Sequence, residues 1–377
     1  MSRNVLFIRS DVKLAGPARL MLSSACALRD AGVNVTFATG GGAMVEQIEG
    51  SGFRHITIPE LRLEGRSLGR TAKSALQLLR LCLKHRFAVV HSFNLHAGIS
   101  AFPGAKLTCA ELFNTVLGNG KERLLAKVPI KLVAVSNSVR DKLISCGVPA
   151  KRIEVIYNAT LDSRFLAASA SELDQILDKR ALITPITFVS VAMFTGGKGH
   201  AEIVEAAHIY RKAEHAPEIK IKLVGDGRCM EEIKAQVASY GMADVFEFVG
   251  ASNSVEAHLD TSHVFIHLAE METFGMVLAE AGARGLPCIA SNVGGIPEVV
   301  LDGQSGILVD RNDAAHVADC MAMLAGSREM RDRLGRAGAA RARALFSQHK
   351  MGQDLLALYG FGDPSPKPTE KNRQPQP

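Results

Sequence analysis

The sequence predicts an α/β protein built of two parallel-sheet domains that face each other across a cleft. At 377 residues the chain is long for a single hydrophobic core, which favours two domains. Short runs rich in β-branched residues alternate with segments of helical periodicity, and this alternation is typical of parallel sheets covered by helices. The alternation starts again in the second half of the chain, after a less regular stretch at 158–172.

In the first half, apolar runs bounded by turn residues predict buried strands, and apolar residues at helical spacing predict the helices between them. The expected elements are a strand at 5–9 (VLFIR), a helix at 18–31, and strands at 33–39 (VNVTFAT), 87–92 (FAVVHS) and 131–136 (KLVAVS). The N-terminal apolar run is too short for the core of a signal peptide, so we interpret it as the first strand.

The second half repeats the scheme. The expected elements are strands at 186–193, 219–225, 245–250, 264–269 and 287–291, with helices at 200–213, 229–240 and 275–284. Each half therefore predicts a Rossmann-like domain, the first at 1–165 and the second at 166–361, with the last helix packing back on the first domain. The tail at 362–377 is rich in proline and polar residues and is predicted to be disordered.

The composition argues against several classes of protein. No uncharged apolar run reaches the roughly 18 residues of a membrane-spanning helix. The seven cysteines form no C-x-x-C pair, so we expect neither a disulfide framework nor a zinc site, and a reducing cytoplasmic setting fits best. Aromatic content of 5% without tryptophan argues against a module that stacks nucleic-acid bases.

The charge is distributed unevenly between the two halves. Residues 1–165 contain 23 basic and 11 acidic residues, a net charge of +12, whereas the remainder carries −6. Two domains of opposite charge are expected to face different partners. The basic domain suits anionic lipid head groups or an acceptor that carries phosphate; the alternative is a solvated basic surface without a partner.

Residues 270–285 (EMETFGMVLAEAGARG) contain two glutamates, Glu272 and Glu280, around a predicted helix start near Gly275. Free backbone N–H groups and the helix dipole favour an anion there, and glycine leaves room for it. Eight residues of helix span about 12 Å, which suits an extended ligand with hydroxyl groups at both ends and phosphate in the middle, such as a nucleotide-sugar. The alternative is a pair of ordinary helix glutamates. We interpret Glu270 as a peripheral residue at the end of the strand.

Three glycine-rich turns follow predicted strands of the same half. They are TGGKGH (195–200), LVGDGR (223–228) and SNVGGIPEVV (291–300). Because the carboxyl ends of parallel strands lie at one edge of a sheet, these turns are expected to meet the two glutamates there. Lys198, in the first turn, can meet a diphosphate as a point charge, although GGKG lacks the rest of the P-loop pattern.

The order of these motifs resembles that of the retaining glycosyltransferases of family 4, which have the GT-B fold. The resemblance is dense over 186–345, where it is carried by KGH, LVGDG, FVG, the E-x7-E block ETFGMVLAEA, GLPCIASNVGGIPEVV and DGQSGILV. It is looser in the first half, through LAGPARLMLSSACALRDAGVNVTF, FAVVHS, KLVAVSNSVRDKL and IEVIYNATLDSRF.

The resemblance implies roles for matching positions. Glu272 would hold hydroxyls of the transferred sugar, and Glu280 would bind the ribose. Lys198 would neutralise the diphosphate leaving group, and Gly16, in the loop after the first strand, would approach the donor phosphate from the other domain. The other donor-binding residues that it implies are Gly199, Gly225, Val249, Thr273, Phe274, Gly275 and Met276, with backbone amides of 273–276 facing the diphosphate and sugar.

The resemblance also implies a reaction without a metal or other cofactor. Neither half contains the Asp-x-Asp pattern that holds a metal-bound diphosphate in the other main glycosyltransferase fold. Protein cations and helix dipoles would replace the metal. Retention would proceed by front-face attack, in which the leaving phosphate oxygen takes the proton of the acceptor, so no dedicated base is expected.

The chain departs from the family pattern at one cation. Met193 stands five residues before Lys198, where the family usually has an arginine. Arg9 and Arg19 are the candidates to supply the missing phosphate contact, which is otherwise absent.

A second departure concerns a histidine. Many members carry one in a turn beside the donor sugar, where this chain has Leu117 in NTVLG. His91 and His96, in VVHSFNLHAG, are the candidate catalytic substitutes. A structural role in the core is the alternative for both.

Together these features predict a retaining, metal-independent glycosyltransferase. It would transfer a sugar from a nucleoside-diphosphate sugar, most simply a UDP-sugar, to a saccharide or lipid-linked acceptor held by the first domain, in cell-surface polysaccharide or glycolipid synthesis. We expect it in the cytoplasm, at the inner face of the plasma membrane, with no nucleic-acid partner. The stretch 66–86 has a basic helical face that either contacts an anionic membrane or is simply solvated.

Two alternatives stay open. One is a nucleotide-sugar epimerase of the same fold, which needs no acceptor. The other is a catalytically silent, glycosyltransferase-like partner subunit, suggested by Met193 and Leu117.

Overall fold

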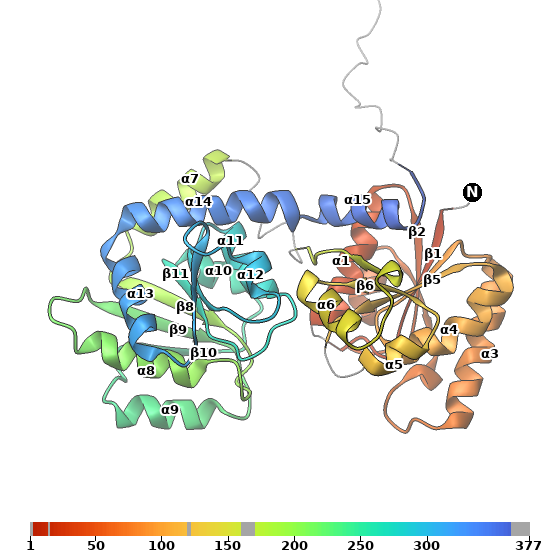
Figure 1. Cartoon of the computed structure of the whole chain (residues 1–377), viewed down its shortest axis with the longest axis horizontal. Helices are drawn as coiled ribbons and strands as arrows, with labels where there is room; N and C mark the ends of the chain where they lie inside the picture. The colour runs from red at the N-terminus through yellow and green to blue at the C-terminus, as the bar shows by residue number, and fades with distance from the viewer. Residues whose placement is uncertain (1–2, 14–15, 119–121, 160–169, 363–377) are drawn as a thin grey trace, which may run out of the picture.

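The computed structural model describes residues 3–13, 16–118, 122–159 and 170–362. Figure 1 shows two α/β domains side by side, the first coloured from red to yellow and the second from green to blue. Each domain contains one parallel sheet flanked by helices. The predicted fold class, two Rossmann-like domains, is therefore confirmed.

The first sheet has seven strands in the order β3-β2-β1-β4-β5-β6-β7. Its strands are β1 Asn4–Arg9, β2 Asn34–Thr39, β3 Arg54–Thr57, β4 Val89–Ser92, β5 Glu111–Val116, β6 Lys131–Ala134 and β7 Ile153–Val155. The helices of this domain are α1 Gly16–Asp30, α2 Val45–Gly50, α3 Leu68–His85, α4 Leu95–Thr108, α5 Glu122–Lys127 and α6 Asn137–Ser145, with short 3-10 turns at Pro59–Leu61 and Ala150–Arg152.

The second sheet has six strands in the order β10-β9-β8-β11-β12-β13. Its strands are β8 Ile186–Val191, β9 Ile219–Val224, β10 Phe246–Gly250, β11 Val264–His267, β12 Cys288–Ser291 and β13 Gly306–Val309. Its helices are α7 Ala170–Ala181, α8 His200–Arg211, α9 Met230–Ser239, α10 Val255–Asp260, α11 Met276–Ala283, α12 Ile296–Val299, α13 Ala314–Gly326 and α14 Arg328–Leu345.

Every strand and helix predicted by residue range is present, with ends that differ by at most two residues. Four strands were not predicted. Three of them, β3, β7 and β13, are short strands at sheet edges, where one side lacks a neighbour and a continuous apolar run is not required. The fourth, β5, lies inside the first sheet but carries buried Asn114 and Thr115, which interrupt the apolar pattern.

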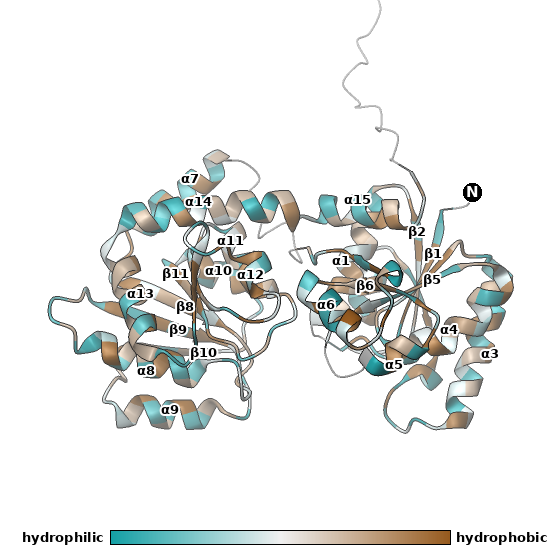
Figure 2. Ribbon diagram, in the orientation of Figure 1, coloured by the Kyte–Doolittle hydropathy of each residue, from teal (hydrophilic) through white to brown (hydrophobic). Residues whose placement is uncertain are grey.

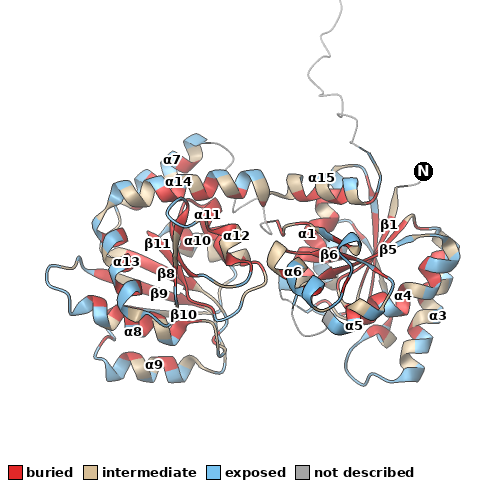
Figure 3. Cartoon of the chain, viewed as in Figure 1, coloured by how far each residue is buried: buried red, intermediate tan, exposed pale blue. Residues whose placement is uncertain are grey.

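The two sheets form the centres of two hydrophobic cores. Apolar residues concentrate on the strands (Figure 2), and the buried residues fill the middle of each domain (Figure 3). Phe7 of β1 lies in register with Phe37 of β2, and both side chains are fully buried. Phe188 of β8 and Phe265 of β11 are buried in the same way in the second domain. Burial of both faces explains why the central strands are continuous apolar runs.

One helical segment near the C-terminus runs across both domains (Figure 1). The helix α14 packs on α11 of the second domain, whereas α15 (Gln348–Leu358) packs on α1 of the first. Met351 and Leu355 of α15 and the following Tyr359 belong to the core of the first domain. The predicted domain boundary at 165–166 and the predicted tail beyond Gly362 lie outside the described residues.

Within the described ranges, no helix combines the length and apolar character that a bilayer crossing would require.

Glycines allow α11 and α14 to pack closely. A Cβ on Gly335 of α14 would lie 2.1 Å from the carbonyl oxygen of Gly285, which is far inside van der Waals contact. Gly282 and Gly338 also face each other, with a Cβ on Gly282 reaching the Gly338 carbonyl oxygen at 3.5 Å. The backbone of α14 therefore approaches the turn that follows α11 too closely for a side chain at Gly335.

We predict that Gly335→Ala lowers the midpoint of thermal unfolding, because the added methyl group must push α14 away from α11 at a cost of about 1–3 kcal/mol. Gly69→Ala is the matched control: its Cβ meets nothing within 4 Å, and alanine is the better helix former by about 1 kcal/mol. Circular dichroism melting curves measure both. A Gly335→Ala protein that unfolds with or above the wild type would contradict the packing.

Candidate active site

The predicted donor-binding residues gather at the carboxyl edge of the second sheet. The loops that follow β8, β9, β11 and β12 carry Lys198, Gly225, Glu272 and Gly294, respectively. These four strands are neighbours in the sheet, so the loops emerge side by side. This is the edge at which open parallel sheets bind ligands.

Backbone contacts between glycines and neighbouring loops hold this edge together. A Cβ on Gly225 would lie 1.9 Å from the carbonyl oxygen of Ala192, and one on Gly199 would lie 2.3 Å from that of Leu268. A Cβ on Gly294 would lie 1.9 Å from the carbonyl oxygen of Glu272. All three glycines also have positive φ angles, so side chains are excluded by conformation as well as by space.

Lys198 and Glu272 form an ion pair in the middle of these loops. The Nζ atom of Lys198 lies 3.1 Å from Oε2 of Glu272, and the Nε2 atom of His267 lies 3.7 Å from the same oxygen. Burial by itself would raise the pKa of Glu272, but the His267 imidazole and the Lys198 ammonium outweigh it and lower the pKa to about 2. Glu272 is therefore ionised at neutral pH and acts as a hydrogen-bond acceptor.

The helix α11 begins directly beside this pair. Its N-cap residue, Gly275, has φ +97° and makes no side-chain cap, so it does not block the first backbone N–H groups of the helix, at Met276 and beyond. The amide of Thr273 donates to Oε1 of Glu272 at 3.2 Å. The Phe274 side chain is buried and packs edge-on against Phe346, so this residue can contribute to a ligand site through its backbone.

Glu280 lies on α11 and is 7% exposed, so it does not face bulk solvent as an ordinary surface glutamate would. It makes contacts within the chain. Val249, on β10, is half-buried. Gly16 is the first residue of α1 rather than a loop residue, and nothing lies within 4 Å of the position of its Cβ.

Glu270 has a partner that the sequence did not suggest. Its carboxylate lies 3.4 Å from Nη1 of Arg311, which also pairs with Glu202 of α8. The amide of Glu270 donates to the carbonyl oxygen of Gly197 at 2.8 Å. Glu270 therefore supports the loop that carries Lys198.

His91 is hydrogen-bonded within the core of the first domain. Its Nδ1 is hydrogen-bonded to the Tyr359 hydroxyl at 2.5 Å and its Nε2 to Thr115 Oγ1 at 2.7 Å. Burial lowers the pKa of His91 to about 3. Both ring nitrogens thus have partners in the core of the first domain, which favours the structural alternative, and the catalytic assignment of His91 stays a prediction.

His96 lies in the first turn of α4, at the carboxyl end of β4, and is also buried. Its assignment as a catalytic candidate stays a prediction.

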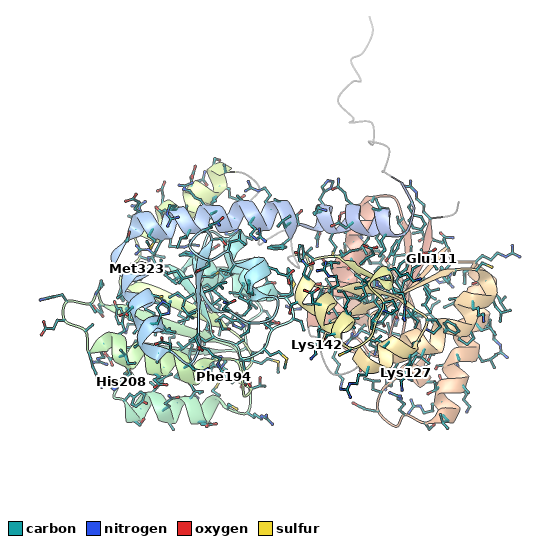
Figure 4. All side chains as sticks on the ribbon, viewed as in Figure 1. Glu111, Lys127, Lys142, Phe194, His208 and Met323 are labelled. Atoms are coloured by element: carbon teal, nitrogen blue, oxygen red, sulfur yellow. The ribbon has the colours of Figure 1, made fainter. Side chains whose placement is uncertain are left out.

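Arg9, one of the two arginines considered for the missing cation, is engaged within its own domain. Arg9 donates to the carbonyl oxygens of Asp11 and Phe93, at 2.8 and 2.7 Å, and so holds loops of its own domain. Arg19 is exposed on α1. The Met193 side chain is 67% exposed, close to Phe194, which is labelled in Figure 4.

A cavity of about 630 Å³ lies elsewhere, between β6, β7 and α15. Its lining includes Lys151 and Glu154, and three of its basic residues have partners within the chain: Lys131 with Glu111, Lys350 with Asp354, and Arg152 with carbonyl oxygens that include that of Ile130. The glycine-rich turns and the glutamates of the E-x7-E block lie away from this cavity. We therefore assign the site to the loops of the second sheet. Among the described residues, no group of three or more His, Cys, Asp or Glu side chains is arranged to hold a metal ion.

Comparison with known families agrees with this arrangement. The family model of the group 1 glycosyl transferases matches residues 175–341, and that of Glycosyltransferase Family 4 matches residues 15–162. The chain belongs to the family 4-type glycosyltransferases with the GT-B fold. The recognised part thus includes both domains and the whole E-x7-E block.

Individual relatives of this glycosyltransferase are distant. It is 28% identical over 231 residues to the N-acetyl-alpha-D-glucosaminyl L-malate synthase of Bacillus anthracis, an alignment that covers 60% of this chain and 58% of that protein. It is 29% identical over 214 residues to the GDP-mannose-dependent alpha-(1-6)-phosphatidylinositol monomannoside mannosyltransferase of Mycobacterium tuberculosis, which covers 54% of each chain. The aligned part is therefore little more than half the length of these curated relatives.

Solved structures share the fold over nearly the whole chain. A glycosyltransferase from Rickettsia africae superposes with a TM-score of 0.79 at 20% identity, covering 95% of this chain and 98% of that one. Anabaena HepE, solved in complex with UDP and glucose, superposes with a TM-score of 0.76 at 17% identity, covering 94% and 99%.

The two domains of the glycosyltransferase are joined by a carboxylate that the sequence did not single out. Glu298 of α12, the glutamate of the GGIPE motif, accepts hydrogen bonds from the first domain. The donors are the amides of Asn137 and Ser138 at 2.7 and 2.8 Å, the Asn137 side chain at 2.8 Å and the Tyr157 hydroxyl at 3.0 Å. The carboxylate thus satisfies the free N–H groups at the start of α6, where the helix dipole favours a negative charge.

Two further hydrogen bonds cross between the domains at the loop that carries Glu272. Ser136 Oγ donates to the carbonyl oxygen of Thr273 at 2.7 Å, and Thr273 Oγ1 donates to that of Leu117 at 3.3 Å. The candidate donor loop is therefore held from the first domain as well as from the second. The sequence signal for Glu298 was its place in the GGIPE motif. Its hydrogen-bond donors on α6 could not be inferred from the sequence.

We predict that Glu298→Ala loosens the contact between the domains, because it leaves four donors without their acceptor at a cost of about 2–3 kcal/mol. The expected results are a lower midpoint of thermal unfolding and a larger radius of gyration by small-angle X-ray scattering. Glu298→Gln keeps one acceptor oxygen, so its values should lie between those of the wild type and of Glu298→Ala. Glu247→Ala, at an exposed glutamate, serves as the control. Scattering and melting curves identical to the wild type would contradict a joining role.

Proposed function

We propose that this protein transfers a sugar, with retention of configuration and without a metal, from a nucleoside-diphosphate sugar to a saccharide or lipid-linked acceptor. The observation that carries the proposal is the Lys198–Glu272 ion pair. It lies beside the start of α11, which has no side-chain cap, and among loops whose glycines leave no room for a side chain. A cation, free amides and an ionised carboxylate are the groups that a sugar diphosphate requires.

Each group has a distinct task in this proposal. Lys198 and the first amides of α11 neutralise the charge that develops on the leaving diphosphate. Glu272, ionised and half-buried, accepts hydrogen bonds from hydroxyls of the transferred sugar. Glu280 accepts hydrogen bonds from the ribose. Because Lys198 pairs with Glu272, a bound diphosphate would replace the Glu272 carboxylate as the partner of Lys198.

A front-face mechanism suits these groups. The acceptor hydroxyl attacks the anomeric carbon of the sugar from the side of the leaving diphosphate. The new C–O bond to the acceptor forms as the C–O bond to the phosphate breaks, and the leaving phosphate oxygen takes the hydroxyl proton. The chain then needs no separate general base, and the two hydrogen bonds that His91 makes in the core are compatible with this.

A UDP-sugar is our first choice of donor. HepE, a structural relative, was solved with UDP and glucose, whereas a curated relative is GDP-mannose-dependent. A thermal-shift screen against UDP-, GDP- and ADP-sugars decides the base, since a ligand that binds the native state raises its melting temperature. Incubation of labelled UDP-sugar without acceptor distinguishes transfer from epimerisation, because an epimerase needs no acceptor. Release of the nucleotide distinguishes an enzyme from a catalytically silent partner subunit.

We propose that the first domain binds the acceptor at the inner face of the plasma membrane, in cell-surface polysaccharide or glycolipid synthesis. Residues 65–110, which include α3 and α4, contain seven Lys or Arg and no Asp or Glu. On the outer side of α3, Leu76 and Leu83 are exposed at 47% and 53% between Lys73, Arg80 and Lys84. Exposed leucines among basic residues suit the surface of an anionic bilayer.

We predict that Lys198→Ala lowers kcat by about 100-fold or more, because one charge contact to the leaving group is lost. The UDP-induced rise in melting temperature should shrink as well. Glu280→Ala should weaken donor binding and affect kcat less. Lys234→Ala is the control, since Lys234 is an exposed residue of α9 that pairs with Glu231. Normal turnover by the Lys198→Ala enzyme would rule out its role at the diphosphate.

We predict that Leu76→Ser with Leu83→Ser reduces binding to phosphatidylglycerol-containing vesicles by at least about tenfold, because apolar area that enters the bilayer is removed. Sedimentation with vesicles measures the effect, and high salt should weaken binding by the wild type. Leu182→Ser removes a leucine that is 84% exposed, on the second domain, and should change nothing. Wild-type binding by the double variant would place any membrane contact elsewhere.

A further inference from the structure

His267, at the end of β11, is a buried histidine for which packing gives no reason. It is 1% exposed, and neither of its ring nitrogens has a hydrogen-bond partner among the described residues. The strand before it, Val264–Ile266, is apolar. An apolar residue would fit this position at lower cost, since a buried polar group without a partner destabilises the fold.

The imidazole faces the carboxylate of Glu272. Its Nε2 lies 3.7 Å from Oε2, just beyond hydrogen-bond distance, while Lys198 occupies that oxygen at 3.1 Å. The other carboxylate oxygen, Oε1, accepts from the amide of Thr273 at 3.2 Å. After Lys198, the His267 imidazole is therefore the next group close to Oε2 of Glu272.

This step rests on the proposed function: donor binding changes which groups contact the Glu272 carboxylate. When the diphosphate takes Lys198, the half-buried Glu272 loses its closest cationic neighbour. A movement of about half an ångström brings the Nε2–H of His267 within ordinary hydrogen-bond distance of Oε2. Two fixed donors, His267 and the Thr273 amide, would then orient the carboxylate.

We propose that His267 is a positioning residue for Glu272. It donates to Oε2 once Lys198 has moved to the diphosphate, so that the remaining lone pairs of the carboxylate point at the hydroxyls of the sugar. His200 is the neighbouring histidine, but its ring is stacked on Phe194 with 4.1 Å between centroids. The Nε2 atom of His200 also lacks a hydrogen-bond partner among the described residues, but it is the Nε2 of His267 that lies 3.7 Å from Glu272.

The test compares His267→Leu and His267→Gln in the full chain. For His267→Leu we expect kcat to fall by at least tenfold, while KM for the donor and the affinity for UDP stay within about twofold. The melting temperature should change little, because the Nε2–Oε2 separation of 3.7 Å is longer than an ordinary hydrogen bond. Glutamine can place an N–H near the position of Nε2, so His267→Gln should recover most of kcat. Wild-type kcat in His267→Leu would overturn the proposal.

His263, just before β11, provides the matched control. It is as buried as His267, but its ring nitrogens are hydrogen-bonded to the amide of Thr187 at 2.9 Å and to the carbonyl oxygen of Arg180 at 3.0 Å. His263→Leu should therefore lower the melting temperature and leave kcat per folded molecule unchanged. If His267→Leu instead lowers the melting temperature in parallel with kcat, its role is structural and the proposal fails.

A crystal structure with UDP provides a readout that does not depend on turnover. We expect Lys198 at the diphosphate and the Nε2–Oε2 distance within about 3.2 Å. A bound UDP with that distance unchanged or longer would overturn the positioning role and leave the proposed function standing. A wild-type protein that binds none of UDP, GDP and ADP would refute the proposed function, and this inference with it.

Discussion

The candidate site depends on the close approach of backbone segments at the carboxyl edge of the second sheet. A Cβ on Gly225 or on Gly294 would lie 1.9 Å from a carbonyl oxygen of a neighbouring loop. Loops that touch through their backbones cannot shift without breaking van der Waals contact. The side chains that remain, Lys198 and Glu272 among them, are therefore held in a fixed relation to each other and to the start of α11.

The second domain does not hold this edge by itself. Thr273, beside Glu272, exchanges hydrogen bonds with Ser136 and Leu117 of the first domain, and Glu298 caps α6. The helix α15 adds the last part of the chain to the core of the first domain. A change in the angle between the domains would therefore act directly on the loop that carries Glu272, which connects domain movement to the proposed donor site.

Much of this architecture could be predicted, because strands buried on both faces are continuous apolar runs and the glycine-rich turns that follow them are distinctive. The fold class and the family are confirmed. The roles of Lys198 and Glu272 stay predictions, although the structure brings the two within 3.1 Å across 74 residues of sequence. Glu270, which looked peripheral, pairs with Arg311, a residue that no local pattern connects to it.

The environments of the buried histidines could not be predicted from the sequence. The sequence pointed to His91 and His96 and not to His267, although His91 and His267 both follow apolar residues on buried strands. In the structure, His91 is hydrogen-bonded to Tyr359, 268 residues away, whereas His267 lies 3.7 Å from the carboxylate of Glu272 in the E-x7-E block.

The sequence by itself determined the two α/β domains, the edge at which their ligand is expected and the residue types present there, because strand periodicity, glycine turns and motif spacing are local properties of the chain. The tertiary structure alone decided which polar groups are already satisfied and which are not. Hydrogen-bond partners such as Tyr359 for His91 and α6 for Glu298 come from distant segments, and their distances are set by how sheets and domains pack, which no local pattern encodes.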